Sequence, residues 1–428
     1  MSLTLTLLRS QMEIKVAYGQ EKVPIRVPEE NVLGVFHPNE VETGPERQTL
    51  MNALEHPMGG PSFEAFLEGA KDVLFIVNDG TRPTPTANVL QIIRASLRKV
   101  NHRFIIATGC HRAPTEEEYR FIFGPLYPES KDRVFVHESR DEKGMVHLGT
   151  SQNGTEMYVN RLGVEAEKLV AISSVEPHYF GGYTGGRKSF LPGIASYKTI
   201  EQNHKYAIRS EAKALALGGN PVHDDMIDAL QSVQGKPIFS IQVVLDRERR
   251  IYGATTGDIH ASLDGAIAKA NEVFCVAVPQ KADIVVSVAP YPMDVDLYQS
   301  QKALDNGKLA LKEGGILIMV SKCRTGIGEK AFFELLAGAG GDPKKALAQI
   351  DHGYKLGYHK AAKIAEIALW AKMWAVTDLP DSDLRSVFMQ PFSSVQKAVD
   401  EALAVKGPDA RVLFLMDGSI TVPMIHDA

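Results

Sequence analysis

Several loops of this chain carry the residue types that enzymes use for chemistry. The first loop is Asp79-Gly-Thr-Arg-Pro-Thr-Pro85, which brings an acid, a hydroxyl and a guanidinium into one turn. Arg82 could hold a carboxylate through two parallel hydrogen bonds, a geometry that a lysine does not reproduce. The same turn could instead cap a helix that Pro85 opens, with Arg82 in solvent. Both interpretations stay open from this segment alone.

A histidine follows in the segment Gly109-Cys-His-Arg-Ala-Pro-Thr115. His111 comes just after an apolar run, and an imidazole in such a loop could exchange protons in a cleft. A lone histidine is also commonly an incidental polar residue. Thr115 and Glu118 have the spacing of a capping box, which predicts that a helix begins there.

The densest segment is Glu176-Pro-His-Tyr-Phe-Gly-Gly-Tyr-Thr-Gly-Gly-Arg-Lys-Ser-Phe-Leu-Pro-Gly. Its glycines let the main chain approach a ligand closely. The segment misses the order of the ATPase phosphate loop, and Pro192 would interrupt the helix that such a loop opens, so we reject an ATPase. Lys188 remains a candidate nucleophile, activated by desolvation or by the neighbouring Arg187. A glycine hinge with solvated basic residues is the alternative.

A third histidine, His204, follows Lys188 by 16 positions and His178 by 26. Together with His111, these histidines could bind zinc in an open catalytic site. The spacing does not demand it, because no pair has the short helical separation of a zinc hydrolase.

The second half of the chain carries Tyr291-Pro-Met-Asp-Val-Asp-Leu-Tyr-Gln-Ser-Gln-Lys302, which follows a predicted strand and opens a helix. Tyr298 and Lys302 share a face of that helix, and Gln299 lies beside it. Such a phenol, amide and ammonium could grip a carboxylate and a hydroxyl, although an exposed helical turn would look the same.

Two further segments of the second half are weaker candidates. The glycine loop that ends at Gly326 to Gly328 could cradle a phosphate at a helix N-terminus. The segment Tyr358-His-Lys360 opens a helix, and its role stays open.

Short β-branched runs alternate with helix-period segments, which predicts βαβ units and a parallel sheet. The polar loops at 78–85, 108–115, 174–178 and 289–292 each follow a predicted strand, and ligands bind beyond the carboxyl ends of such strands. The predicted strands are 72–77, 103–107, 168–173, 238–245, 251–254, 283–288, 316–320 and 411–416. The predicted helices are 86–99, 114–123, 220–232, 259–274, 299–312, 329–337, 359–373 and 394–405.

The length of 428 residues is that of two to three domains. A long helix ends at Val278-Pro-Gln-Lys281 before a new strand, so we predict two α/β domains, 1–278 and 279–428, with mostly parallel sheets and an active-site cleft between them. The N-terminal domain would carry Lys188 and the histidines His111, His178 and His204.

The overall composition is that of a folded chain without a strong charge bias. Its formal charge of -5 gives no basic excess for nucleic acid or an anionic membrane. Three cysteines without paired spacing fit a reducing compartment, and we found neither a signal peptide nor a membrane-spanning run, so we expect a cytoplasmic protein.

Taken together, these segments resemble the nickel-dependent lactate racemase family of 2-hydroxyacid racemases and epimerases. They run in the family's order from about residue 12 to the end of the chain. The matching elements are Asp79-Gly-Thr-Arg-Pro, Gly109-Cys-His-Arg-Ala-Pro-Thr, Glu176-Pro-His-Tyr-Phe, Gly185-Gly-Arg-Lys-Ser-Phe-Leu-Pro-Gly, the Asn203-His pair and Leu297-Tyr-Gln-Ser-Gln-Lys302.

The family's enzymes carry a covalently attached nickel-pincer nucleotide, the nickel form of pyridinium-3,5-bisthiocarboxylic acid mononucleotide. The resemblance implies the tether on Lys188, a nickel ligand at His204 and paired acid/base roles for His111 and His178. It implies substrate contacts at Arg82, Tyr298, Gln299 and Lys302. The candidate cofactor contacts are Lys188, Arg187, Asp79, Thr81, Gly185, Gly186 and the loop from Gly326 to Gly328.

The activity that the resemblance implies is inversion of C2 in a 2-hydroxy acid, lactate-like in its reacting part, by reversible hydride transfer. Two histidines are needed because the enantiomers place their hydroxyl on different sides. The implied partners are the 2-hydroxy acid and cofactor-biosynthesis proteins. The substrates handled by the family also include malate, longer hydroxy acids and sugar acids, and the oligomeric state stays open. A non-catalytic binding paralogue and a zinc hydrolase are the alternatives.

Overall fold

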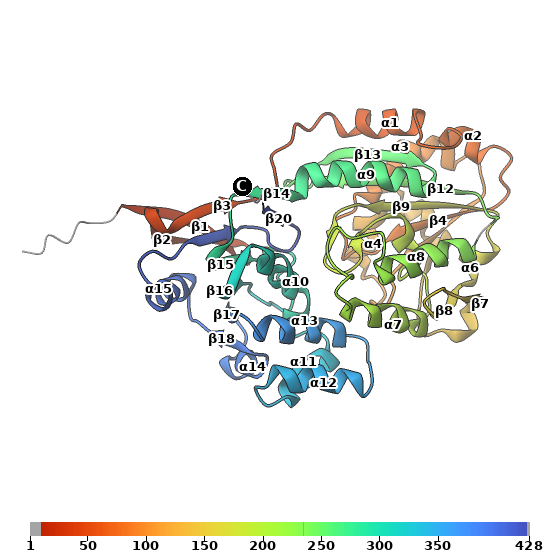
Figure 1. Cartoon of the computed structure of the whole chain (residues 1–428). Coiled ribbons are helices and arrows are strands. Elements are labelled where there is room, and N and C mark those ends of the chain that lie inside the picture. Colours follow the sequence, from red (N-terminus) through yellow and green to blue (C-terminus); the bar gives the residue numbers. More distant parts are fainter. Residues whose placement is uncertain (1–9, 234, 426–428) are drawn as a thin grey trace, which may run out of the picture. The chain divides into compact units, whose positions relative to one another are not determined.

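The computed structural model describes residues 10–233 and 235–425, which form two compact units (Figure 1). One unit is contiguous, Asn39–Phe274. The other combines the chain from Cys275 onward with the segment that ends at Pro38. The division expected from the sequence, 1–278 and 279–428, differs from this at both places. A strand before Pro38 pairs with the sheet of the C-terminal unit, and Cys275–Val278 pairs with Val422–Ile425. We describe each unit by itself.

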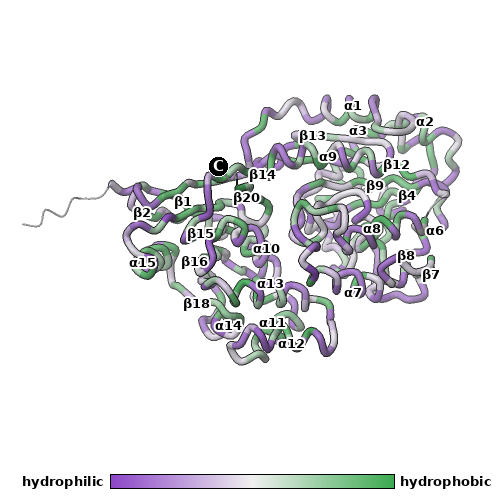
Figure 2. The backbone as a smooth tube through the Cα atoms, in the orientation of Figure 1, coloured by the Kyte–Doolittle hydropathy of each residue, from purple (hydrophilic) through white to green (hydrophobic). Residues whose placement is uncertain are grey.

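The contiguous unit is built on a six-stranded sheet in the order β13-β12-β9-β4-β5-β6. All neighbouring pairs are parallel except β12 and β13. Side chains alternate between two cores, so that Phe75 lies on one face of the sheet and Ile76 on the other. Figure 2 shows hydrophobic residues gathered along these central strands. The strands are β4 Val73–Asn78, β5 His102–Ala107, β6 Val134–Val136, β9 Lys168–Ser174, β12 Ile238–Leu245 and β13 Ile251–Gly257.

Helices and two small hairpins cover this sheet, with α9 packed along β12 and β13 (Figure 1). The helices are α1 Glu46–Glu55, α2 Phe63–Leu67, α3 Thr86–Leu97, α4 Glu116–Phe123, α5 Tyr127–Ser130, α6 Arg161–Glu165, α7 Tyr197–Lys205, α8 Pro221–Ser232 and α9 Ile259–Phe274. The hairpins are β7 Met145–Thr150 with β8 Glu156–Asn160, and β10 Pro177–His178 with β11 Gly182–Tyr183.

The C-terminal unit contains a second six-stranded sheet, parallel throughout, in the order β18-β17-β16-β15-β19-β3. Its strands are β3 Val32–Phe36, β15 Ala282–Val288, β16 Leu311–Val320, β17 Lys372–Val376, β18 Met389–Pro391 and β19 Val412–Leu415. The hairpin of β1 Gln11–Tyr18 and β2 Glu21–Pro28 packs Ile14, Val16, Ile25 and Val27 into the core of this unit. A short parallel pair joins β14 Cys275–Val278 to β20 Val422–Ile425.

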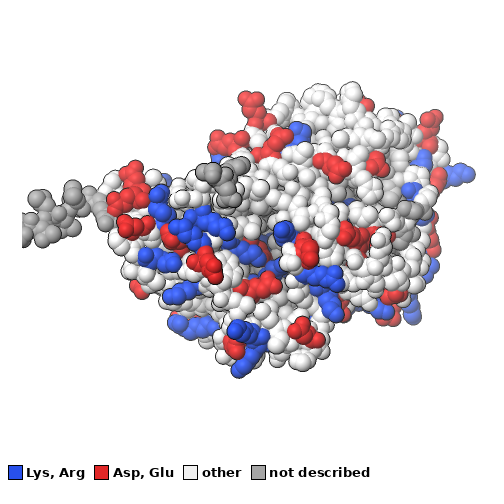
Figure 3. All heavy atoms as spheres, viewed as in Figure 1, with Lys and Arg blue, Asp and Glu red and all other residues white. Residues whose placement is uncertain are grey.

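The helices of this unit are α10 Leu297–Gly307, α11 Lys330–Gly338, α12 Pro343–Asp351, α13 Tyr358–Ala368, α14 Asp381–Ser386 and α15 Val395–Lys406. Figure 3 shows Lys and Arg side chains gathered on the visible face of this unit, while acidic ones are frequent on the contiguous unit.

The predicted α/β fold class with mostly parallel sheets is confirmed, and two predicted helix ends are wrong. α10 stops at Gly307, where a Cβ would lie 3.0 Å from the Cβ of Ser287, and the chain turns into β16 instead of continuing to 312. α13 stops at Ala368 rather than 373, because Met373, Trp374 and the residues that follow form the buried strand β17. No helix in the described part of the chain is long and apolar enough to cross a membrane.

Candidate functional site

The loop after β4 pairs a buried carboxylate with a histidine from the loop after β5. Asp79 is 5% exposed, and its Oδ2 lies 2.6 Å from Nδ1 of His111. Thr81 donates to Oδ1 of Asp79 from both its hydroxyl and its backbone N–H, at 2.6 and 3.1 Å. Burial opposes ionisation, but the hydrogen bond and charge of His111, with Arg82 and Thr81, hold the pKa of Asp79 below its usual value. The carboxylate therefore keeps the proton of His111 on Nδ1 and leaves Nε2 as the basic atom.

Three loops at the carboxyl ends of neighbouring strands touch one another. The hydroxyl of Thr84, after β4, lies 2.8 Å from that of Ser174 at the end of β9. Gly109, after β5, donates its backbone N–H to the carbonyl of Gly193 at 3.0 Å, which joins the His111 loop to the segment that follows Lys188. Three of the four polar loops that the sequence places after strands therefore lie together in the contiguous unit.

A capping box fixes where the chain after His111 becomes helical. Thr115 accepts the N–H of Glu118, and the carboxylate of Glu118 accepts the N–H of Thr115 at 2.6 Å, as predicted. Arg112 adds two hydrogen bonds to the same carboxylate. His111 thus lies on a short loop that is tied down at both ends.

The aromatic ring of Phe180 is the centre around which three predicted site residues gather. The ring of His178 lies 4.5 Å from it edge to face, the ring of His204 lies 5.0 Å away, and Nζ of Lys188 lies 5.8 Å from its centroid. The candidate site residues that the sequence predicted did not include Phe180. Its position between His178 and the glycines, in the densest polar segment, could have indicated it.

His178 is 8% exposed and its ring orientation is fixed by its own hairpin. The backbone N–H of Gly181 donates to Nδ1 of His178 at 3.1 Å. A neutral imidazole that accepts at Nδ1 carries its proton on Nε2. His111 and His178 therefore hold their protons on opposite ring nitrogens.

Arg187 shapes the glycine loop from within. It is fully buried, and its guanidinium donates to the carbonyls of Gly181 and Tyr183 at 2.9 and 3.1 Å and to Nδ1 of His223 at 2.9 Å. Burial lowers the pKa of Arg187 to about 9, and burial with the charge of Arg187 lowers the pKa of His223 to about 4. These hydrogen bonds favour a role in holding the loop that presents Lys188, and direct cofactor contact by Arg187 stays a prediction.

Gly185 and Gly186 are glycines for a steric reason. Gly185 has φ +85°, and a Cβ there would lie 2.5 Å from Val175 and 2.8 Å from Gln242. The N–H of Gly186 donates to the side chains of Ser173 and Gln242 at 3.2 and 3.1 Å. The loop packs on the sheet through these residues, and their predicted cofactor contacts remain untested.

His204 lies in the last turn of α7, next to Asn203. Its Nδ1 lies 3.1 Å from Oδ1 of Asn203. Among the residues that the structure describes, no three His, Cys, Asp or Glu side chains lie close enough to hold a metal ion together. The geometry therefore does not favour a zinc centre built from His111, His178 and His204. A metal whose cofactor supplies most of its ligands would need only one protein side chain as ligand.

In the C-terminal unit, the first turn of α10 is tightly held. Asp296 accepts the N–H of Gln299 at 2.7 Å, and the N–H groups of Leu297 and Tyr298 donate to the carbonyls of Gly326 and Ile327 at 3.1 and 3.0 Å. The loop from Gly326 to Gly328 thus turns carbonyl oxygens toward α10. Carbonyl oxygens repel a phosphate, so this geometry does not favour the phosphate site that the glycines of the loop suggested.

Lys360 connects the segment Tyr358-His-Lys360 to the first turn of α10. It is 4% exposed, donates from Nζ to the carbonyl of Tyr298, and lies 3.8 Å over the Tyr298 ring. His359 is 1% exposed, and its Nδ1 lies 2.7 Å from the hydroxyl of Tyr354. Lys360 therefore positions one of the predicted substrate residues.

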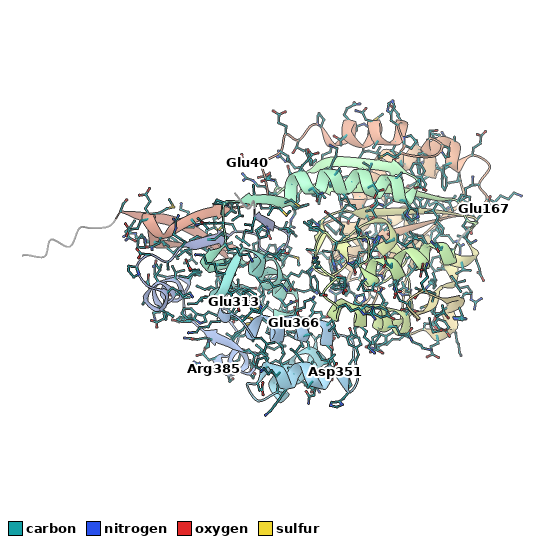
Figure 4. All side chains as sticks on the ribbon, in the orientation of Figure 1. Glu40, Glu167, Glu313, Asp351, Glu366 and Arg385 are labelled. Atoms are coloured by element: carbon teal, nitrogen blue, oxygen red, sulfur yellow. The ribbon has the colours of Figure 1, made fainter. Side chains whose placement is uncertain are left out.

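A buried charge network joins the far ends of α10 and α13. Lys308 donates to Asp305 at 2.9 Å, and Gln301 donates to the same carboxylate. On α13, burial lowers the pKa of Lys363 and raises the pKa of Glu366, which Figure 4 labels. The charges of Asp305 and Lys308 also act on Lys363 and Glu366, so the ends of α10 and α13 interact electrostatically.

Comparison with known families matches both units. A family model described as the lactate racemase N-terminal domain matches residues 18–216, and one described as the lactate racemase C-terminal domain matches residues 277–422. A lactate racemase of Thermoanaerobacterium thermosaccharolyticum is 31% identical over 95% of this chain and 97% of its own length. One from Lactiplantibacillus plantarum is 32% identical over 95% of this chain and 98% of its own.

Solved structures give the same picture. The lactate racemase apoprotein from T. thermosaccharolyticum superposes with a TM-score of 0.89 and 30% identity, covering 96% of this chain and all of the other. A Thermotoga maritima protein superposes with a TM-score of 0.65 at 17% identity over 87% of this chain and all of its own, which is a likeness of fold.

Proposed function

The chain belongs to the lactate racemase family, a family of isomerases, and from this premise we propose that it inverts C2 of a 2-hydroxy acid. The observation that carries the proposal is the set of residues around Phe180, together with the Asp79–His111 pair. This set supplies a base, a second histidine, a nucleophilic amine and a metal-binding imidazole within one unit.

The residues present fit a covalently tethered nickel-pincer nucleotide. Lys188 is half-buried beside an aromatic ring, which suits an amine that forms a thioamide, and His204 supplies one imidazole as nickel ligand. When bound, the nucleotide supplies an acceptor and donor of hydride. Asp79, Thr81, Arg187, Gly185 and Gly186 belong to the loops that would surround it.

His111 is the base in this proposal. Nε2 of His111 removes the hydroxyl proton of one enantiomer, and the Asp79 carboxylate at 2.6 Å from Nδ1 stabilises the imidazolium that forms. Because Asp79 is buried and ionised, the pair is prepared before substrate arrives.

His178 serves the opposite face of the substrate. The N–H of Gly181 keeps the His178 proton on Nε2, the atom that would face the substrate oxygen. The two histidines alternate as acid and base, because the two enantiomers place their hydroxyl on different sides of the site.

The carboxylate common to all 2-hydroxy acids needs fixed cations. Arg82 is the carboxylate partner in this proposal, and Tyr298, Gln299 and Lys302 of the C-terminal unit stay predicted substrate contacts. Lys360 supports this grip indirectly through its hydrogen bond to the Tyr298 carbonyl.

The decisive experiment is a chiral-product assay of cofactor-loaded protein against a panel that includes lactate, malate, longer aliphatic and aromatic hydroxy acids and sugar acids. We expect interconversion of at least one pair of stereoisomers. Complete cofactor loading without turnover on any of them would contradict the proposal and favour a non-catalytic binding paralogue. The protein must be made together with the cofactor-biosynthesis proteins, which are its proposed partners for loading.

A further inference from the structure

The imidazole of His204 has a hydrogen-bond partner whose own orientation is fixed. Asn203 is fully buried, and its Oδ1 lies 3.1 Å from Nδ1 of His204. A carbonyl oxygen only accepts hydrogen bonds, so it requires the proton of the neutral imidazole on Nδ1. In that tautomer Nε2 carries the lone pair that binds a metal.

The side-chain amide of Asn203 is held in this orientation by two acceptors on α8. Its Nδ2 donates to the carbonyl of Val222 at 3.1 Å and to Oδ2 of Asp225 at 3.4 Å. If the amide were turned over, its oxygen would face a carbonyl and a carboxylate, and two acceptors would meet without a proton. The amide therefore points its oxygen at His204.

Asp225 is in turn fixed by four donors. It is fully buried on α8 and accepts hydrogen bonds from Ser151, Asn153 and Thr155 at 2.8, 3.0 and 2.6 Å, besides the one from Asn203. Three of the donors come from the turn between β7 and β8. The carboxylate thus ties that turn, α8 and α7 together at one point.

We propose that Asp225 and Asn203 are positioning residues that hold His204 in its Nδ1–H tautomer and present Nε2 as the metal ligand. The tautomer assignment stands on the hydrogen bonds alone, whereas the metal step rests on the proposed function. Metal-binding histidines depend on such partners, and losing one costs about 10- to 100-fold in metal affinity.

Phe180 packs against the imidazole ring of His204. It lies 5.0 Å from the His204 ring at an interplanar angle of 70°. Asn220, which caps α8, donates to the carbonyl of Phe180 at 2.8 Å. α8 therefore orients His204 in two ways. Its residues Val222 and Asp225 accept from the Asn203 amide, and its cap residue Asn220 holds the backbone of Phe180.

The test compares Asn203→Leu with Asn153→Leu in the full-length chain. Both variants remove one amide donor from Asp225, but only Asn203→Leu removes the acceptor of His204. Nitrogen NMR of apoprotein labelled with ¹⁵N-histidine, with the His204 signals assigned by His204→Gln, reports which ring nitrogen is protonated. We expect Nδ1–H in the wild type and in Asn153→Leu, and a mixture of tautomers in Asn203→Leu.

A wild-type signal with the proton on Nε2, or an unchanged tautomer in Asn203→Leu, would overturn the assignment. If Asn203→Leu does not fold, Asn203→Ala replaces it, because it removes the same acceptor of His204 without placing a branched side chain in the buried site. The same mixture of tautomers is expected there.

The metal step is tested separately, by mass spectrometry of cofactor-loaded protein during a chelator challenge. We expect nickel loss about 10- to 100-fold faster in Asn203→Leu than in Asn153→Leu. Equal rates would overturn the metal step. An unchanged rate in His204→Gln would also overturn it, and would reject the ligand assignment of the proposed function while leaving the tautomer result intact.

Discussion

Replacing Asp79 by Asn isolates the contribution of one buried carboxylate to the proposed base. Asp79→Asn keeps the size of the side chain but removes the negative charge that lies 2.6 Å from Nδ1 of His111. The imidazolium that forms when His111 takes a proton then loses its counter-charge, while the ring itself stays in place.

The size of the effect follows from the strength of that hydrogen bond. A hydrogen bond to a charged group contributes about 1.5–3 kcal/mol, and each 1.36 kcal/mol changes a rate tenfold, so kcat should fall about 10- to 150-fold. If the new amide turns its NH₂ toward His111, the proton moves to Nε2 and the loss approaches about 10⁴, as when other Asp–His pairs lose their carboxylate.

The assay is chiral-product analysis at equal cofactor loading, checked by intact mass for each variant. Glu156→Gln is the matched control, because His147 and Glu156 form a similar pair at 2.8 Å that is solvent-exposed. We expect the turnover of the control to equal that of the wild type. Wild-type turnover in Asp79→Asn at equal loading would refute the reasoning.

A stability measurement on the apoprotein gives a second check on Asp79 that needs no turnover. The folded-state pKa of Asp79 lies below its unfolded value of about 3.9, so the ionised carboxylate stabilises the fold above that pH. This stabilisation is lost as the pH falls through the folded pKa. The difference in urea midpoint between wild type and Asp79→Asn should therefore be largest near neutral pH and shrink below about pH 4. A difference that grows on acidification would show that the sign is wrong.

Three further predictions concern Lys188, the two histidines of the proposed mechanism and the buried His137. Lys188→Ala should abolish covalent cofactor loading, and an intact-mass spectrum that retains the adduct would reject the tether. His111→Ala and His178→Ala should each lose interconversion with nickel still bound, and full turnover in either variant would reject the two-base scheme. Burial lowers the pKa of His137 to about 4, so the unfolded chain binds a proton first and the fold should lose about 3 kcal/mol between pH 6.5 and 4. His137→Gln should lose correspondingly less over that range in urea unfolding, and identical losses would contradict this.

Local signals predicted the elements that position the site. The bounds 238–245 and 259–274 agree with β12 and α9, and the capping box at Thr115 is where its spacing placed it. These features depend on residues within one or two turns of each other, which is what a sequence pattern reports. The hairpin β1–β2 also has such a pattern, with Ile14, Val16, Ile25 and Val27 alternating, and it was overlooked.

What the sequence did not predict depends on contacts between distant segments. From the sequence, Arg187 is a candidate cation for a phosphate. In the structure it is buried and donates to carbonyls of its own loop and to His223. The pairing of Asp79 with His111 joins two loops, and the role of Lys360 needs α10 and α13 side by side. The helix ends at Gly307 and Ala368 were set by the strands that follow them.

The pairing of β3 with β19 has a consequence for how the protein is made. β3 leaves the ribosome long before its sheet partner, which begins at Val412. At about 5–20 residues per second, the chain between Phe36 and Val412 takes about 20–75 s to synthesise, and the contiguous unit can fold within that time. The edge of β3 stays unpaired until β19 has been synthesised. A ribosome that stalls before β19 would therefore release a folded contiguous unit preceded by an open, aggregation-prone strand.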